Sequence, residues 1–311
     1  YLNILSWVDS PNDLTFRSGE HEVVVFDQDG VYLGYYDKEQ GFGFVVNEYN
    51  VDSITDDELI DVTKKIANFK PDNKFFEMTI QRILEKSHNL GTVAVAEQIE
   101  SEDFYNTWEK LGFGKSLGIM PRSENPGGLR HFSSWGETDK RSLSFGHGPM
   151  TTNLAQLARS YLIFANDGAI PSLKLIKIKN DSHNLVQVFS PESSKRISQI
   201  LDSVASIKGS GYRSIINGYS VAGKTGTAEM VIDGKYSKDG AKRTYFVGYS
   251  PAKNPKYIMA IRLDHPKKCY YFDNPDKKLK CEGSNSAAIA FQKAMKRILI
   301  NDPEVSSKIE S

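Results

Sequence analysis

The sequence predicts an α+β fold, with strands near both ends of the chain and helices between them. Residues 21–35 have the pattern of a hairpin whose turn is Asp29-Gly30, and two further strand-like runs lie at 245–249 and 257–263. Between these regions, apolar residues recur at helical spacing. Strands and helices grouped in this way pack as layers around a common core.

The helices follow from apolar spacing and from their end signals. The run at 78–86 places Ile80, Ile83 and Leu84 on one helical face, and Gly91 is expected to act as a breaker soon after it. Ser101 is expected to cap a helix at 101–111 that ends before Gly112. Further helices are expected at 57–69, at 152–166, from Ser190-Pro191 onward, and at 286–300.

Composition is typical of an ordinary globular domain. At 311 residues the chain can bury a substantial core. We expect one domain at 21–301, preceded by a tail or linker at 1–20 and followed by a tail at 302–311. The 39 Lys and Arg residues balance 39 Asp and Glu residues, so nucleic-acid binding is not indicated. No apolar run approaches membrane-spanning length, and the first residue is Tyr1 rather than Met, which suggests a piece of a longer protein.

The two cysteines, Cys269 and Cys281, flank a polar segment. In an oxidising compartment they could pair across this loop, and the alternative is two free thiols. No Cys or His companions stand at zinc-ligand spacing around them. We therefore expect neither a metal site nor a cofactor.

The most informative motif is a Lys-Thr-Gly-Thr stretch on a short expected strand. An ammonium group and two hydroxyls on one strand form a rim that can hold a carboxylate, and a glycine allows a ligand backbone to approach closely. The alternative is a polar edge strand with a solvated lysine. The motif consists of Lys224, Thr225, Gly226 and Thr227.

A second motif, Ser-His-Asn, ends the helix expected at 78–86 and contributes Ser87 and Asn89. Ser-x-Asn followed far downstream by Lys-Thr-Gly is the motif pair of penicillin-interacting serine enzymes. The chain here resembles the transpeptidase domain of class B penicillin-binding proteins, and most closely the septal, division-type enzyme. The segments 21–35, 143–158 and 245–257 resemble that family's first hairpin, Gly-rich loop and later hairpin. This resemblance implies an antiparallel sheet packed against helices, with a helical subdomain.

One family feature is missing. The nucleophile of the family is the serine of a Ser-x-x-Lys, which should lie between the first hairpin and Ser87, but residues 36–86 contain no such motif. Ser250-Pro-Ala-Lys253 has the right spacing, yet it stands between two strand-like runs and is expected to form a hairpin turn. Ser182-His-Asn184 repeats Ser-x-Asn within a polar stretch and is also expected to be a turn. The nucleophile is therefore unknown.

The resemblance implies a role for each remaining motif residue. Ser87 would relay protons to the leaving amine, and Lys224 would favour the Ser87 alkoxide and the substrate carboxylate. Asn89 would hold the substrate peptide amide, whereas His88 would be structural. Thr225 and Thr227 would bind the carboxylate beside Gly226, and the Thr227 N–H would contribute to an oxyanion hole. The alternatives are a helix cap at Ser87 and a turn at Asn89.

Two functions remain open. The first is a peptidoglycan D,D-transpeptidase whose nucleophile segment is absent from this chain. The second is a degenerate penicillin-binding-like protein that binds stem peptides or division partners without catalysis. The resemblance implies D-Ala-D-Ala stem peptides, β-lactams and membrane proteins of cell-wall synthesis as partners. It also implies an inner-membrane anchor, with this domain in the periplasm or otherwise outside the cytoplasmic membrane.

Overall fold

The structure is a computed structural model that describes most of the chain from residue 78 onward, together with short segments before it. The described residues are 21–29, 32–36, 42–43, 78–119, 124–148, 150–174, 184–232, 235–237, 240–267, 269 and 278–306. The helix expected at 57–69 lies outside these residues.

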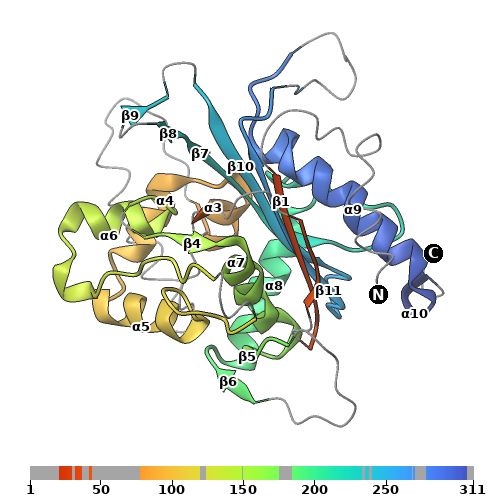
Figure 1. The fold of residues 1–311 in the computed structure, drawn as a ribbon, viewed down its shortest axis with the longest axis horizontal. Helices are drawn as coiled ribbons and strands as arrows, with labels where there is room; N and C mark the ends of the chain where they lie inside the picture. Colours follow the sequence, from red (N-terminus) through yellow and green to blue (C-terminus); the bar gives the residue numbers. More distant parts are fainter. Residues whose placement is uncertain are drawn as a thin grey trace.

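A five-stranded antiparallel sheet forms the centre of the molecule, with strand order β2-β1-β11-β10-β7 (Figure 1). The expected α+β class is confirmed. The hairpin expected near the start of the chain is formed by β1 and β2, and the later hairpin by β10 and β11. The sheet strands are β1 (His21–Asp27), β2 (Tyr32–Tyr36), β7 (Ala222–Glu229), β10 (Lys242–Ser250) and β11 (Tyr257–Asp264).

The two faces of this sheet contribute to two separate hydrophobic cores. Successive side chains of a strand point to opposite faces. Along β10, Tyr245 and Val247 therefore pack into the core beneath the helical subdomain, while Phe246 packs against Phe291 of the last long helix. Figure 1 shows this helix, α9, on one side of the sheet and α7 and α8 on the other. The layered arrangement follows because the near-continuous apolar runs of β10 and β11 supply buried side chains to both faces of the sheet.

The helices and minor strands complete the architecture. The helices are α3 (Ile80–Lys86), α4 (Asn89–Ala96), α5 (Ser101–Leu111), α6 (Glu137–Ser144), α7 (Leu154–Ser160), α8 (Pro191–Val204), α9 (Ala287–Asn301) and α10 (Pro303–Ser306). Single 3-10 turns lie at Phe132–Ser134, Tyr161–Ala165, Tyr212–Ser214 and Gly283–Asn285. The minor strands are β3 (Phe42–Gly43), β4 (Thr152–Asn153), β5 (Ala169–Pro171), β6 (Leu185–Gln187), β8 (Val231–Ile232) and β9 (Lys235–Tyr236).

Several helix ends differ from the expectation. Ser101 is the first residue of α5 rather than its cap, because Glu100 occupies the N-cap position. The helix expected to begin at 152 starts at Leu154, where Asn153 caps it and accepts a hydrogen bond from the Gln156 N–H. Gly112 ends α5 with a left-handed φ of 91°, as expected.

Gly91 does not break a helix, and that expectation is wrong. It lies inside α4, where a Cβ would fall 2.7 Å from Cγ1 of Ile83. The missing side chain therefore lets α4 pack directly against α3, and this contact outweighs the low helix propensity of glycine.

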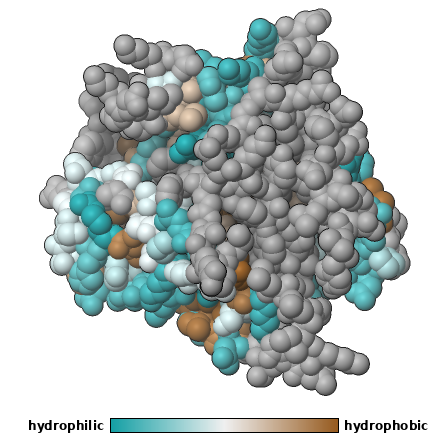
Figure 2. All heavy atoms as spheres, viewed as in Figure 1, coloured by the Kyte–Doolittle hydropathy of each residue, from teal (hydrophilic) through white to brown (hydrophobic). Residues whose placement is uncertain are grey.

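The exterior shows no sign of a metal site or a membrane span within the described part of the chain. No cluster of three or more His, Cys, Asp or Glu residues there could hold a metal ion. Of the helices described, none combines the length and the apolar character needed to cross a bilayer. The described part of the face in Figure 2 is mainly hydrophilic, with small hydrophobic areas between.

The two cysteines are joined in a disulfide, Cys269–Cys281, with their Cα atoms 5.4 Å apart. Of the two alternatives that the sequence left open, the structure selects the bridge.

Candidate active site

Lys224 lies at the centre of the site, on the edge strand β7. Its side chain is only 4% exposed, so the solvated lysine considered from the sequence is not observed. The Nζ donates hydrogen bonds to Ser87 Oγ at 2.8 Å and to the Thr225 carbonyl oxygen at 3.0 Å. Burial lowers the pKa of Lys224 to about 8, and no carboxylate in the described residues forms an ion pair with it.

Ser87 reaches Lys224 from the junction of two helices. It occupies the C-cap position of α3 in a left-handed conformation with φ 51°, and its backbone N–H donates to the Leu84 carbonyl oxygen at 3.1 Å. This conformation costs a non-glycine residue roughly 1–2 kcal/mol. The side chain of Ser87 does not cap a helix. Its Oγ instead accepts the hydrogen bond from Lys224.

The residues after Ser87 start the next helix. His88 is the N-cap of α4, and its Nδ1 accepts a hydrogen bond from the Gly91 N–H at 3.0 Å. This is the structural role expected for His88. Asn89 is exposed in the first turn of α4, two positions after Ser87, so it is helical rather than part of a turn.

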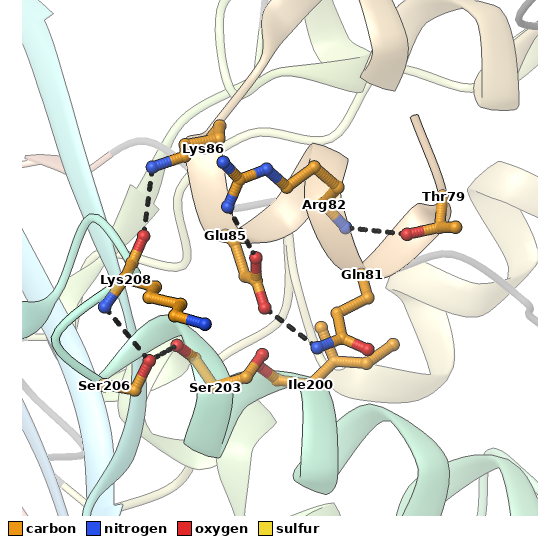
Figure 3. A network of polar contacts seen from close by, with 9 residues as sticks. All are labelled: Thr79, Gln81, Arg82, Glu85, Lys86, Ile200, Ser203, Ser206 and Lys208. Atoms are coloured by element: carbon orange, nitrogen blue, oxygen red, sulfur yellow. Dashed lines mark hydrogen bonds and ion pairs between the residues drawn. The ribbon is translucent and has the colours of Figure 1, made fainter. Parts of the chain in front are cut away.

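A buried carboxylate fixes the end of α3 that carries Ser87 (Figure 3). Glu85 accepts hydrogen bonds from Gln81 Nε2 at 2.8 Å and from Arg82 Nη1 at 3.0 Å. Burial raises the pKa of Glu85, but the hydrogen bonds from Gln81, Arg82 and Ser203 outweigh it and leave the pKa below its ordinary value. Because Ser203 belongs to α8, this network holds α3 against α8.

The loop after α8 links the two motifs. Lys86 Nζ donates to the Lys208 carbonyl oxygen at 3.0 Å (Figure 3), and the Ser210 N–H donates to the Glu85 carbonyl oxygen at 2.8 Å. The hydroxyls of Thr225 and Ser210 are 3.3 Å apart. The loop thus contacts α3 on one side and β7 on the other. It fixes the position of the Ser-x-Asn motif relative to the Lys-Thr-Gly strand.

Thr227 and Gly226 form the outer part of the site. Thr227 is exposed, and its Oγ1 accepts a hydrogen bond from the Gly283 N–H at 2.9 Å. Beside Gly226 the chain packs against itself, since a Cβ there would lie 3.3 Å from Tyr245 Cβ. The sequence motif did not reveal Glu85, Ser210 or Gly283. The only available signal was the pair of glycines that flanks Ser210.

The one Ser-x-x-Lys of the chain lies elsewhere and has a different geometry. Ser250 is the last residue of β10, is fully buried, and donates its Oγ hydrogen to the Ser220 carbonyl oxygen at 2.8 Å. Lys253 is exposed in the β10–β11 turn. The expected hairpin turn is confirmed. Of the Ser182-His-Asn184 repeat, Ser182 and His183 lie outside the described residues.

The fold and this site define a class: a sheet and a helical subdomain that bring a Ser-x-Asn serine onto the lysine of a Lys-Thr-Gly strand, as in penicillin-interacting serine enzymes. The family model described as the penicillin binding protein transpeptidase domain matches residues 46–295. The chain belongs to this family, as its resemblance to class B penicillin-binding proteins indicated.

Curated relatives carry consistent names. The probable peptidoglycan D,D-transpeptidase PbpC of Pseudomonas aeruginosa is 34% identical over 195 residues, which are 63% of this chain and 34% of that protein. The peptidoglycan D,D-transpeptidase FtsI of Buchnera aphidicola (subsp. Baizongia pistaciae) is 34% identical over 229 residues, 71% of this chain and 37% of its own length. The chain therefore spans about a third of the length of the curated relatives it matches.

Solved structures share the fold at lower identity. The transpeptidase domain of penicillin-binding protein 3 from Burkholderia pseudomallei has a TM-score of 0.76 at 20% identity, over 97% of this chain and 93% of that one. Penicillin-binding protein 3 from Mycobacterium tuberculosis, complexed with aztreonam, has a TM-score of 0.74 at 21% identity, over 99% of this chain and 78% of that one.

Proposed function

We propose that this chain is the penicillin-binding domain of a peptidoglycan D,D-transpeptidase, which cross-links stem peptides during cell-wall synthesis. The observation that carries the proposal is the hydrogen bond from Lys224 Nζ to Ser87 Oγ, beside two threonines of the same strand. Family membership and the names of the relatives support it. The domain comprises residues 21–301, from β1 to the end of α9.

In this proposal the cleft recognises the terminal D-alanine carboxylate of a stem peptide. Lys224 supplies the positive charge, and Thr225 and Thr227 supply hydroxyl donors beside Gly226. Ser87 relays a proton between Lys224 and the leaving amine, which the short Nζ–Oγ distance allows. Asn89, exposed two residues further on, holds the substrate amide.

The acylation step needs a nucleophile that this sequence does not provide at the family position. A serine enzyme without its nucleophile loses on the order of 10⁶ in turnover. We therefore assign this chain carboxylate recognition and proton relay, with acyl transfer dependent on a Ser-x-x-Lys segment that is absent from residues 36–86. The alternative, a catalytically inactive member that binds stem peptides or division partners, is not favoured, because the relatives are named as peptidoglycan D,D-transpeptidases.

Within this proposal the domain has a septal, division-type role, which the resemblance of its motifs to that branch of the class B penicillin-binding proteins supports. We place the domain outside the cytoplasmic membrane, where its substrate is assembled, with an anchor in the longer protein. Membrane proteins of cell division and cell-wall synthesis are the expected partners, and β-lactams are the expected inhibitors.

Equilibrium binding tests the proposal. Isothermal titration with an N-acylated D-alanyl-D-alanine peptide is expected to show binding, and benzylpenicillin should compete with the peptide. The matched control is the same peptide with its terminal carboxylate amidated. Its affinity should be lower by about tenfold or more, because a charge-assisted contact is lost. Equal binding of the acid and the amide would contradict the assignment of the cleft.

A further inference from the structure

A short segment between the disulfide and α9 lies against the outer part of the site. We call residues 278–286 the strap. It includes Cys281, which is bonded to Cys269, and the 3-10 turn Gly283–Asn285. The Leu279 N–H donates to the Cys269 carbonyl oxygen at 2.7 Å, beside this disulfide. The first part of the strap is therefore anchored to Cys269, in the segment that follows β11. The next residues of the strap contact β7.

Internal hydrogen bonds give the strap a defined shape. Asn285 is 9% exposed; its Oδ1 accepts from the Glu282 N–H at 2.7 Å, and its Nδ2 donates to the Lys280 carbonyl oxygen at 2.8 Å. At the end of the strap, the Ser286 hydroxyl bonds to that of Thr244 on β10 at 2.9 Å. The strap is thus fixed to the sheet on the side of Thr227, which pairs with Thr244.

Gly283 makes the contact with the site. Its N–H donates to Thr227 Oγ1 at 2.9 Å. A Cβ on Gly283 would lie 2.5 Å from the Gly226 carbonyl oxygen and 2.8 Å from that of Tyr245, so no larger residue fits without displacing the strap.

This contact orients the Thr227 hydroxyl. A hydroxyl has one donor hydrogen and two acceptor lone pairs, and a backbone N–H can only donate. The Gly283 N–H therefore occupies a lone pair of Oγ1 and leaves the hydroxyl hydrogen to point elsewhere. Because Thr227 is exposed, that hydrogen is available to a ligand oxygen.

We propose that the strap, held by the Cys269–Cys281 disulfide, is a positioning element that orients the Thr227 hydroxyl as a donor to the ligand carboxylate. The inference rests on the carboxylate site of the proposed function and adds residues that lie outside its motifs. Cys281 precedes Gly283 by only two positions, so loss of the bridge would let the strap open locally and release Thr227.

The test compares benzylpenicillin with its methyl ester, which lacks the carboxylate charge, in the oxidised wild-type chain and in a Cys269→Ser/Cys281→Ser variant. Dissociation constants are measured by isothermal titration. The variant is expected to bind the acid more weakly by about tenfold or more, which is the value of one hydrogen bond to a charged group, and to bind the ester as the wild type does. A purely structural loss would weaken both ligands equally.

Thr227 variants provide the matched controls. In a Thr227→Val background the cysteine substitutions should cost nothing further, whereas in a Thr227→Ser background, which keeps the hydroxyl, their effect should persist. If the cysteine variant does not fold, wild-type protein reduced with a phosphine serves instead, with circular dichroism to confirm the fold. An unchanged ratio of acid to ester binding after loss of the bridge would overturn the role of the strap. If the wild-type chain bound benzylpenicillin and its methyl ester equally well, the assignment of the carboxylate site would be wrong, and the role of the strap would be wrong with it.

Discussion

Lys224 Nζ lies 2.8 Å from Ser87 Oγ, although 137 positions separate the two residues. One is a buried ammonium group on a central sheet's edge strand, and the other is an exposed hydroxyl at the end of a helix. The pair was expected from two short motifs, and this convergence of Ser87 with Lys224 is confirmed. The contact makes Lys224 the residue whose replacement most directly tests the site.

Replacement of Lys224 should weaken carboxylate binding and leave the fold intact. Lys224→Met removes the charge but keeps most of the side-chain volume, so the site should lose about 1.5–3 kcal/mol of binding, which is tenfold or more in the dissociation constant. Because the variant also removes a buried charge, the free energy of unfolding should not fall. Titration with benzylpenicillin measures the binding, and the exposed lysine of the β10–β11 turn provides the control variant Lys253→Ala. Unchanged affinity in Lys224→Met would exclude Lys224 from the site.

Binding of carboxylate ligands should depend on pH through Lys224. Burial lowers its pKa from 10.5 to about 8 in the folded chain, so the ammonium group is present below that pH and is lost above it. Affinity for benzylpenicillin should therefore fall as pH rises through about 8, and Lys224→Met should abolish this dependence. Titrations from about one unit below this pKa to about one unit above it measure the effect.

The same pKa shift predicts the direction of a stability change. Between about pH 8 and pH 10.5 the unfolded chain binds the Lys224 proton and the folded chain does not. The Lys224 contribution should therefore make the free energy of unfolding rise with pH across this window. Below the window, the cost of burying the charge is fully present. Urea unfolding of the wild type and of Lys224→Met, measured across this pH window, gives the contribution as the difference between their free energies of unfolding.

The chain itself should not form a covalent penicillin adduct. It contains no Ser-x-x-Lys at the family position, and Ser250 is buried at the end of β10. Intact-protein mass spectrometry after incubation with benzylpenicillin should show the unmodified mass, even where titration shows binding. A mass increase that maps to Ser250 or to another serine would refute this prediction and identify an unexpected nucleophile.

Glu85 should contribute to the stability of the fold, because it fixes the end of α3. Glu85→Ala removes the acceptor shared by Gln81 and Arg82 and should cost about 1–3 kcal/mol in the free energy of unfolding. The control is Glu97→Ala, which breaks an exposed ion pair with Arg141 and should cost less than about 1 kcal/mol. Urea unfolding measures both changes. Equal effects of the two substitutions would mean that the network does not anchor the helix.

The sequence by itself predicted most of the described elements and the residues of the candidate site. Strand-like apolar runs indicated the two hairpins, and the two faces of β10 follow because successive side chains of a strand point to opposite sides. Helical spacing located α3 and α9, and the two motifs identified Ser87 and Lys224. All of these signals are local, because they depend on neighbours within a few positions.

Only the tertiary structure decided the contacts between distant segments. It joined Cys269 to Cys281, gave Gly91 a place inside α4 against Ile83, and laid Gly283 on Thr227. It also buried Lys224, for which the sequence had left a solvated edge strand open as the alternative. These outcomes depend on which surfaces meet when the sheet and helices pack, and the free energy of that packing is spread over many residues far apart in the chain. No local pattern records it.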